Sequence, residues 1–307
     1  MSKIAFIFPG QGAQACGMGQ DFYEHTETGK RIFDKATELM GFSMPQLCFE
    51  ENDRLDITEY TQAAMVTASI AMMRVLEENG INPDVAAGLS LGEYCALAAA
   101  GVMSDEDAIR TVRQRGILMQ EAVPVGEGAM AAILALDAAA IEEVTGAMEG
   151  VWIANYNCPG QIVISGEKAA VEDACEKLKA AGAKRAVMLN VSGPFHSGML
   201  ADAGEKLGEV LSQVELHEPQ IPYVANVTAQ YVKSAAEVKE LLTRQVSSSV
   251  RWQQSVEAMI ADGVDTFIEI GPGKTLAGFM RKISRDVKTL NVEKLEDISK
   301  VAEALKS

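Results

Sequence analysis

The sequence lacks most of the features that mark a secreted, membrane-bound or nucleic-acid-binding protein. Its five cysteines are odd in number and show neither C-x-x-C pairing nor zinc spacing, so we expect reduced, mostly buried thiols and no metal site. The apolar run before Pro9 is too short for a signal peptide, and no later run approaches a membrane span. The net charge of −16 argues against broad attraction to nucleic acid or anionic lipid. These absences predict a soluble, cytoplasmic protein that binds neither nucleic acid nor membrane.

Buried strands alternate with helices along the chain, and this order predicts an α/β fold with a mainly parallel sheet. The first strand is IAFIF at residues 4–8, and its unbroken apolar run is typical of a strand buried on both faces. Further strands are predicted at 85–89, 223–227, 266–270 and 287–292. Helices are predicted at 21–40, 60–79, 92–100, 105–121, 199–213, 236–246 and 251–261, with one more after the glycine turn that follows residue 270.

The stretch from 126 to 192 has a different pattern. Strands are predicted at 129–134, 151–156, 161–165 and 185–189, with helices at 138–148 and 168–181. The resulting order, β-α-β-β-α-β, is that of a ferredoxin-like unit. We therefore expect a small domain at 126–192, inserted into a large α/β catalytic domain formed by 1–125 and 193–307.

The segment Gly88-Leu89-Ser90-Leu91-Gly92 fits the G-x-S-x-G pattern of a nucleophile elbow. About one unrelated chain in ten of this length contains that pattern by chance, so the context decides its value. A buried strand is predicted before Ser90 and a small-residue helix after it, and the helix N-terminus favours an anion developing beside the serine. The alternative is a plain strand-to-helix turn with Ser90 as the helix N-cap.

Only three histidines are available as a base for this serine. His25 and His217 lie in polar stretches and are expected at the surface. His196, in VSGPFHSGML, falls between a predicted strand and a predicted helix, at the end of the sheet where α/β folds bind their ligands. We favour His196 as the general base over a structural histidine. No Asp is placed clearly enough to orient it, so a backbone carbonyl or an amide stays open for that role.

An acyl-transfer site also needs hydrogen-bond donors for an oxyanion. The Leu91 N–H, directly after the serine, is one candidate, and the loop FPGQGAQ around Gln11 can supply a second. That loop also fits a loose dinucleotide-binding pattern, but no strand ending in an acidic residue follows at the required distance. The segment GPGKT at 271–275 lacks the first glycine of a phosphate-binding loop, where Ile268 stands, and is predicted to be a structural turn.

Arg115 is the charge that indicates most about the substrate. On the helix at 105–121 it shares one face with three apolar residues, Ala108, Val112 and Met119. An arginine on an apolar stripe favours a buried anion, and its planar fork suits a carboxylate held by two hydrogen bonds. From the residues alone, a substrate carboxylate and a structural role, as a snorkelling side chain or an ion pair, both stay open. In the first case the acyl group is itself negatively charged.

Several stretches together resemble one family, the malonyl-CoA:acyl carrier protein transacylases. They are FPGQGAQ, GLSLGEYCAL, RQRGILMQEAVP, YNCPGQIVISG, PFHSGML, RWQQSVEAM and EIGPGKTL, in family order across nearly the whole chain. The resemblance implies a hydrolase-like core with a ferredoxin-like insertion. It also implies a set of site roles: Ser90 as nucleophile, His196 as base, Gln11 and the Leu91 N–H at the oxyanion, Arg115 on the malonyl carboxylate, and Gln245 orienting the base through its backbone carbonyl.

The implied reaction moves a malonyl group from malonyl-CoA to the phosphopantetheine thiol of acyl carrier protein through a malonyl-serine intermediate, in fatty acid synthesis. The coenzyme A thioester is a substrate, and no cofactor or metal is expected. The chain is expected to act as a monomer. The alternatives are a trans-acting polyketide acyltransferase, an acyl-thioester hydrolase and a non-catalytic carrier-binding module.

Three further residue patterns bear on this implied activity. Leu89 stands where the family usually has His before the nucleophile, and this difference bears on acyl selectivity or rate. Phe195, directly before the base, resembles the malonyl-selecting version of that motif and favours malonyl over methylmalonyl. The basic segment that contains Arg281, Lys282 and Arg285 is the candidate docking surface for an acidic carrier protein.

Overall fold

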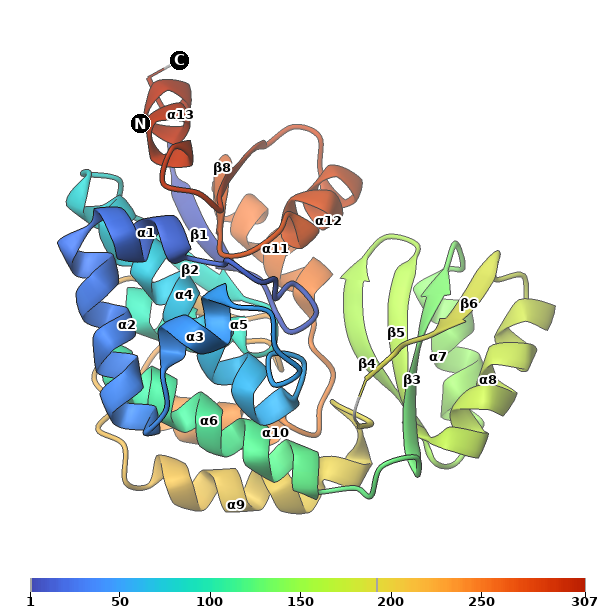
Figure 1. Ribbon diagram of the computed structural model, residues 1–307. Coiled ribbons are helices and arrows are strands. Elements are labelled where there is room, and N and C mark those ends of the chain that lie inside the picture. The colour runs from blue at the N-terminus through green and yellow to red at the C-terminus, as the bar shows by residue number, and fades with distance from the viewer. Residues whose placement is uncertain (1, 192, 307) are drawn as a thin grey trace.

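The computed structural model describes residues 2–191 and 193–306 and contains a large and a small β-sheet (Figure 1). The large sheet has the strand order β7-β2-β1-β8-β9, and each neighbouring pair is parallel. Its strands are β1 (Ile4–Phe8), β2 (Val85–Gly88), β7 (Tyr223–Val224), β8 (Thr266–Ile270) and β9 (Lys288–Val292). The predicted α/β fold with a mainly parallel sheet is confirmed.

Helices cover both faces of the large sheet because its strands are apolar on both sides. Phe6 and Phe8 of β1 face one core, whereas Ala5 and Ile7 face another. The first core is covered by α1 (Gln20–His25), α2 (Glu27–Met40), α3 (Met44–Phe49), α4 (Thr58–Glu78), α5 (Gly92–Ala99), α6 (Asp105–Glu121), α9 (Ala201–Leu211) and α10 (Ala235–Gln245). The second is covered by α11 (Trp252–Ala261) and α12 (Thr275–Ile283) (Figure 1).

The small sheet is antiparallel in the described ladders and has the order β4-β5-β3-β6. Its elements follow one another as β3 (Gly128–Leu134), α7 (Ala138–Gly146), β4 (Val151–Cys158), β5 (Gln161–Glu167), α8 (Lys168–Ala180) and β6 (Arg185–Met188). Helices α7 and α8 pack on the face that carries Ile133 and Ile164. On the opposite face, Met130 and Val163 join the first core of the large sheet. The two sheets therefore share packed side chains.

Several predicted boundaries are wrong, for local reasons. The helix expected at 21–40 is two helices, because Thr26 has an extended backbone (φ −135°) and its side chain accepts the Gly29 N–H as the N-cap of α2. The strand expected at 223–227 ends at Val224, since Asn226 turns away to bond the serine turn. The helix expected at 199–213 begins with a 3-10 turn, Gly198–Leu200. Helices α3 and α13 (Asp297–Ala304) were not predicted, and residue 192, which ends the predicted small domain, lies outside the described residues.

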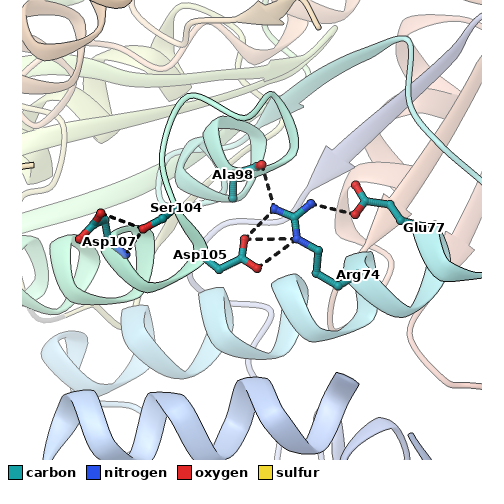
Figure 2. A network of polar contacts seen from close by, with 6 residues as sticks. All are labelled: Arg74, Glu77, Ala98, Ser104, Asp105 and Asp107. Carbon is teal, nitrogen blue, oxygen red and sulfur yellow. Dashed lines mark hydrogen bonds and ion pairs between the residues drawn. The ribbon is translucent and has the colours of Figure 1, made fainter. Parts of the chain in front are cut away.

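A polar network fixes the N-terminal end of α6 (Figure 2). Arg74 of α4 donates to both carboxylate oxygens of Asp105, to Glu77 and to the Ala98 carbonyl that ends α5. Ser104 caps α6 by accepting the Asp107 N–H at 3.0 Å. Helices α4, α5 and α6 are thereby held together at one end, and α6 carries Arg115 towards its other end.

The burial of the cysteines agrees with the expectation from composition. All five cysteines are free thiols, of which four are buried: Cys48, Cys95, Cys158 and Cys175. Among the helices of the described chain, none combines the length and the apolar character that crossing a membrane demands.

Candidate active site

Ser90 lies on a tight turn between β2 and α5. Its φ is 53°, in the left-handed region that non-glycine residues rarely adopt. The flanking glycines are required because backbone crowds the turn: a Cβ on Gly88 would lie 2.0 Å from the carbonyl carbon of Gly92, and a Cβ on Gly92 would lie 2.3 Å from the oxygen of Phe8. The Ser90 N–H donates to Asn226 Oδ1 at 2.7 Å. This geometry is that of a nucleophile elbow.

The side chain of Ser90 meets His196. Ser90 Oγ lies 2.7 Å from His196 Nε2, and His196 Nδ1 lies 2.8 Å from the carbonyl oxygen of Gln245. Because a carbonyl only accepts, Nδ1 carries the proton and Nε2 has the free lone pair that faces the serine hydroxyl. Burial, with the charge of Arg115, lowers the pKa of His196 to about 4, so the ring is neutral at pH 7. The histidine is therefore in the form that accepts a proton.

Arg115 points into the same site from α6 and is 1% exposed. Its Nη1 donates to Gln62 Oε1 at 2.8 Å. Its Nη2 donates to Ser90 Oγ and to Gln245 Oε1, both at 3.1 Å. The serine oxygen thus lies between the imidazole and the guanidinium.

The positive charge of Arg115 has no carboxylate partner within ion-pair distance among the described residues. Its Nε is buried and makes no hydrogen bond with them. Nε and Nη2 form the edge of a guanidinium that binds a carboxylate through two parallel hydrogen bonds. Burial lowers the pKa of Arg115, opposed by Tyr94 and Glu93, so the site has to accommodate an incompletely balanced charge.

Two polar residues behind the turn were missed by the sequence analysis. Glu93, 1% exposed, accepts the Gln245 side-chain amide at 2.6 Å and the Asn226 N–H at 3.1 Å. Burial raises the pKa of this carboxyl to about 7. Asn226 also donates to the Gly88 carbonyl at 2.6 Å, so it bonds both sides of the elbow. The available signal was an acidic residue inside the run GEYCALAAA, where every neighbour is small or apolar.

The expected oxyanion donors come from adjacent strands. β1 and β2 are parallel neighbours with Phe8 opposite Gly88, so the loop with Gln11 and the turn with Leu91 leave the same edge of the sheet. The Leu91 N–H has no hydrogen-bond partner among residues 2–191 and 193–306. The Gln11 side chain donates to Thr58 Oγ1 at 3.1 Å, which fixes it at the start of α4.

His196 also lines a cleft of about 340 Å³, which we call the histidine cleft. Trp152 and Ile153 of β4 form one wall. The segment that joins α10 to α11 forms another, and it directly follows Gln245, whose carbonyl binds His196. The remaining lining residues are Val227, Arg244, Ser247, Ser248, Ser249 and Arg251.

The other candidates of the sequence analysis lie apart from this site. His25 and His217 are exposed, as expected. The GPGKT segment is a structural turn before α12, and its anion position is filled by the protein's own Glu269, whose carboxylate accepts the N–H groups of Leu276 and Ala277. No cluster of three or more His, Cys, Asp or Glu side chains suited to a metal occurs within the described part of the chain.

Comparison with known families gives the class of the protein. The acyl transferase domain matches residues 5–300, which is almost the entire chain. The fold and the serine-histidine pair are consistent with that class, since acyl transfer through a serine needs a nucleophile on a turn and an adjacent neutral base.

Individual relatives narrow this class. The chain is 50% identical to the malonyl CoA-acyl carrier protein transacylase of Bacillus subtilis strain 168, over 100% of this chain and 98% of the relative. The structure of the malonyl CoA-acyl carrier protein transacylase of Clostridium perfringens superposes with a TM-score of 0.96 at 42% identity, covering 99% of this chain and 98% of that one. A chain from a solved complex of a type II polyketide acyl carrier protein with its malonyl-transacylase superposes with a TM-score of 0.95 at 40% sequence identity. The match covers 99% of this chain and 100% of that one. The chain belongs to the malonyl CoA-acyl carrier protein transacylase family.

Proposed function

We propose that this protein transfers the malonyl group of malonyl-CoA to the phosphopantetheine thiol of acyl carrier protein, in fatty acid synthesis. The observation that carries the proposal is the position of Ser90 Oγ, 2.7 Å from a neutral imidazole and 3.1 Å from the guanidinium of Arg115, which has no carboxylate partner among the described residues. A nucleophile, its base and a receptor for a carboxylated acyl group thus meet at one oxygen atom.

In the first half-reaction, His196 Nε2 takes the Ser90 proton as Oγ attacks the thioester carbon. The tetrahedral oxyanion is stabilised by the Leu91 N–H and by the Gln11 loop. When the intermediate collapses, the carbon–sulfur bond breaks and His196 returns the proton to the coenzyme A sulfur. The Gln245 carbonyl holds the ring in the required tautomer throughout.

In the second half-reaction, the carrier thiol gives its proton to His196 and attacks the malonyl-serine ester. The carbon–oxygen bond breaks, and Ser90 regains its proton from the imidazole. The proposed steps use side chains and backbone N–H groups alone, so the coenzyme A thioester is a substrate and no cofactor or metal takes part. Both halves pass through the same oxyanion site, as ping-pong transfer requires.

Arg115 supplies the selectivity for malonyl in this proposal. The malonyl carboxylate accepts from Nε and Nη2, which relieves a buried donor that has no partner in the described chain. An acetyl group leaves Nε without a hydrogen bond. Phe195, which is buried beside the base, is proposed to restrict branching at the α carbon.

We also infer a domain division from the topology. Residues 126–192 form a ferredoxin-like small domain inserted into a hydrolase-like domain of 1–125 and 193–307. The order β-α-β-β-α-β and the separate apolar core beneath α7 and α8 support it. We place the enzyme in the cytoplasm as a monomer, and size-exclusion chromatography with light scattering tests the oligomeric state.

Intact mass spectrometry tests the proposed reaction. The protein is mixed with malonyl-, acetyl- or methylmalonyl-CoA, and then with holo carrier protein. We expect a malonyl adduct on Ser90 that passes to the carrier, and no adduct on Ser90→Ala. An adduct that persists in Ser90→Ala, or no adduct at all, refutes the mechanism. Release of free malonate without transfer makes the protein a hydrolase, and preference for a polyketide carrier over the fatty acid carrier assigns the other pathway.

A further inference from the structure

The histidine cleft carries two arginines at the two ends of one short turn. Arg244 lies in the last turn of α10, directly before Gln245, and Arg251 is the N-cap residue of α11. The turn between them is held against the small sheet, since the Val250 N–H donates to the Ala154 carbonyl at 2.8 Å and the Tyr156 N–H donates to the Val250 carbonyl at 2.9 Å. Both arginines are thus fixed, through their backbone, to the segment that orients the catalytic imidazole.

The two guanidinium groups are available to an anion. Arg251 is exposed and lies 5.7 Å above the ring of Tyr156, with no acidic partner among the described residues. Arg244 pairs with Glu240 at 3.3 Å, but the two side chains are 52% and 73% exposed. An exposed ion pair one helical turn apart contributes little to stability, so a phosphate can compete with Glu240 for Arg244. In a chain with a net charge of −16, two cations in one cleft indicate a negatively charged ligand.

The remaining lining of the cleft suits an uncharged chain with amide groups. Trp152 is 37% exposed, an unusual value for so large an apolar side chain, and it provides a flat apolar wall. On the facing segment, the hydroxyls of Ser247 and Ser248 make no side-chain hydrogen bond within the described residues. Apolar and polar contacts therefore lie between the arginines and His196.

We propose that Arg251 and Arg244 bind the phosphate of the phosphopantetheine arm while the arm itself lies along Trp152 with its thioester end at His196. This inference rests on the proposed transfer reaction. Malonyl-CoA and the holo carrier protein share only the phosphopantetheine group, and each has to bring its sulfur to Ser90 in turn. A receptor for the shared phosphate serves both half-reactions, whereas a receptor for adenosine or for the carrier surface serves one.

Two small donors that differ only in the phosphate test the inference: malonyl-phosphopantetheine and malonyl-pantetheine. The measurement is kcat/KM for formation of malonyl-Ser90, followed by rapid quench and intact mass. In the unmodified protein we expect the phosphorylated donor to react at least about tenfold better, as a charge-assisted contact provides. Arg251→Gln and Arg244→Gln should each reduce that ratio, and the double variant should bring it close to one. Arg251→Lys should retain part of it.

Arg110→Gln is the matched control, because Arg110 is also exposed and also pairs with a glutamate one helical turn before it, Glu106 at 3.5 Å, but lies outside the cleft. Its ratio should equal that of the unmodified protein, and thermal unfolding shows that each variant is folded. A ratio of one in the unmodified protein, or a ratio that the double variant leaves intact, overturns the inference. An effect of the arginines on malonyl-CoA but not on malonyl-phosphopantetheine assigns them to the nucleotide and overturns it as well. If neither donor forms an adduct on Ser90, the proposed function fails instead.

Discussion

Ser90 and His196 meet at 2.7 Å although each has a left-handed backbone, with φ of 53° and 57°. For a residue with a Cβ, this conformation costs about 1–2 kcal/mol. Two of the four described non-glycine residues with positive φ are thus the two members of the proposed catalytic pair. With these backbone angles the Ser90 hydroxyl and the His196 ring point towards each other, as the proposed transfer requires.

The strain at Ser90 should appear when two inactive variants are compared. Ser90→Ala and Ser90→Gly both remove the hydroxyl, so neither forms an adduct, but only glycine adopts positive φ freely. We expect Ser90→Gly to be more stable than Ser90→Ala by about 1 kcal/mol in urea unfolding. Equal free energies of unfolding would show that the turn is not strained at this residue.

Arg115→Ala should remove the preference for a carboxylated acyl group. Losing a charge-assisted contact of about 1.5–3 kcal/mol predicts a fall of about 10- to 150-fold in the ratio of kcat/KM for malonyl-CoA over acetyl-CoA. Arg113→Ala is the control, because Arg113 lies on the same helix and pairs with Glu59. A loss of both activities in proportion, with the ratio unchanged, would assign Arg115 a purely structural role.

The pH dependence of serine malonylation should lack the usual histidine limb. Burial lowers the pKa of His196 from 6.5 to about 4, so the imidazole stays neutral well below pH 6.5. The rate of serine malonylation should therefore stay level over that range. The same pKa shift also makes the free energy of unfolding depend on pH. Because the folded pKa is below the unfolded one, the contribution of His196 is fully present above pH 6.5 and is lost as the pH falls towards 4.

Glu93 makes the stability depend on pH in the opposite direction, because burial raises its pKa from 4.5 to about 7. Its contribution to stability is present below pH 4.5 and is lost as the pH rises through 7. Glu93→Gln should therefore flatten the fall in stability between pH 4.5 and about 7 while leaving the His196 effect in place. A fall in the single-turnover rate of malonylation below pH 6.5, in both the unmodified protein and Glu93→Gln, would contradict the assignment of a neutral imidazole.

Two helical glycines should respond to alanine in opposite ways. At Gly92 a Cβ would lie 2.3 Å from the Phe8 oxygen, which belongs to β1 and cannot move freely, so Gly92→Ala should destabilise the protein by about 1–3 kcal/mol and slow serine acylation. At Gly278 of α12 nothing lies within 4 Å, so Gly278→Ala should stabilise it by up to about 1 kcal/mol. Urea unfolding of both variants tests the pair, and a neutral Gly92→Ala would count against the tight elbow.

The site residues differ in how far the sequence alone indicates them. Ser90 and Arg115 carry local signals, namely a turn motif between predicted elements and a cation on an apolar helix face. Gln245 had none, because its contact with His196 uses a backbone carbonyl, which every residue possesses. Asn226 and Glu93 bond each other from different elements, and a predicted strand even covered Asn226. Such contacts depend on tertiary placement, which periodicity does not encode.

The predictions of secondary structure show the same difference between local and tertiary signals. The predicted strand at 4–8 and the predicted helix at 105–121 agree with β1 and α6, because each depends on its own residues. The break at Thr26 was missed, since a threonine is compatible with a helix interior until its side chain accepts a hydrogen bond as a cap. Helix α3 is short and begins with Pro45 in its first turn, so it presents too few turns for a periodic pattern.

The bridge between Val250 and Asn155 has a consequence for engineering. Transplanting residues 126–192 from a relative into this scaffold would replace β4, the strand that binds the segment after Gln245. The orientation of the His196 imidazole should change with it. Such hybrids should therefore differ in turnover even where every residue named in the reaction comes from the recipient, and restoring the recipient's own β4 sequence is the first repair to attempt.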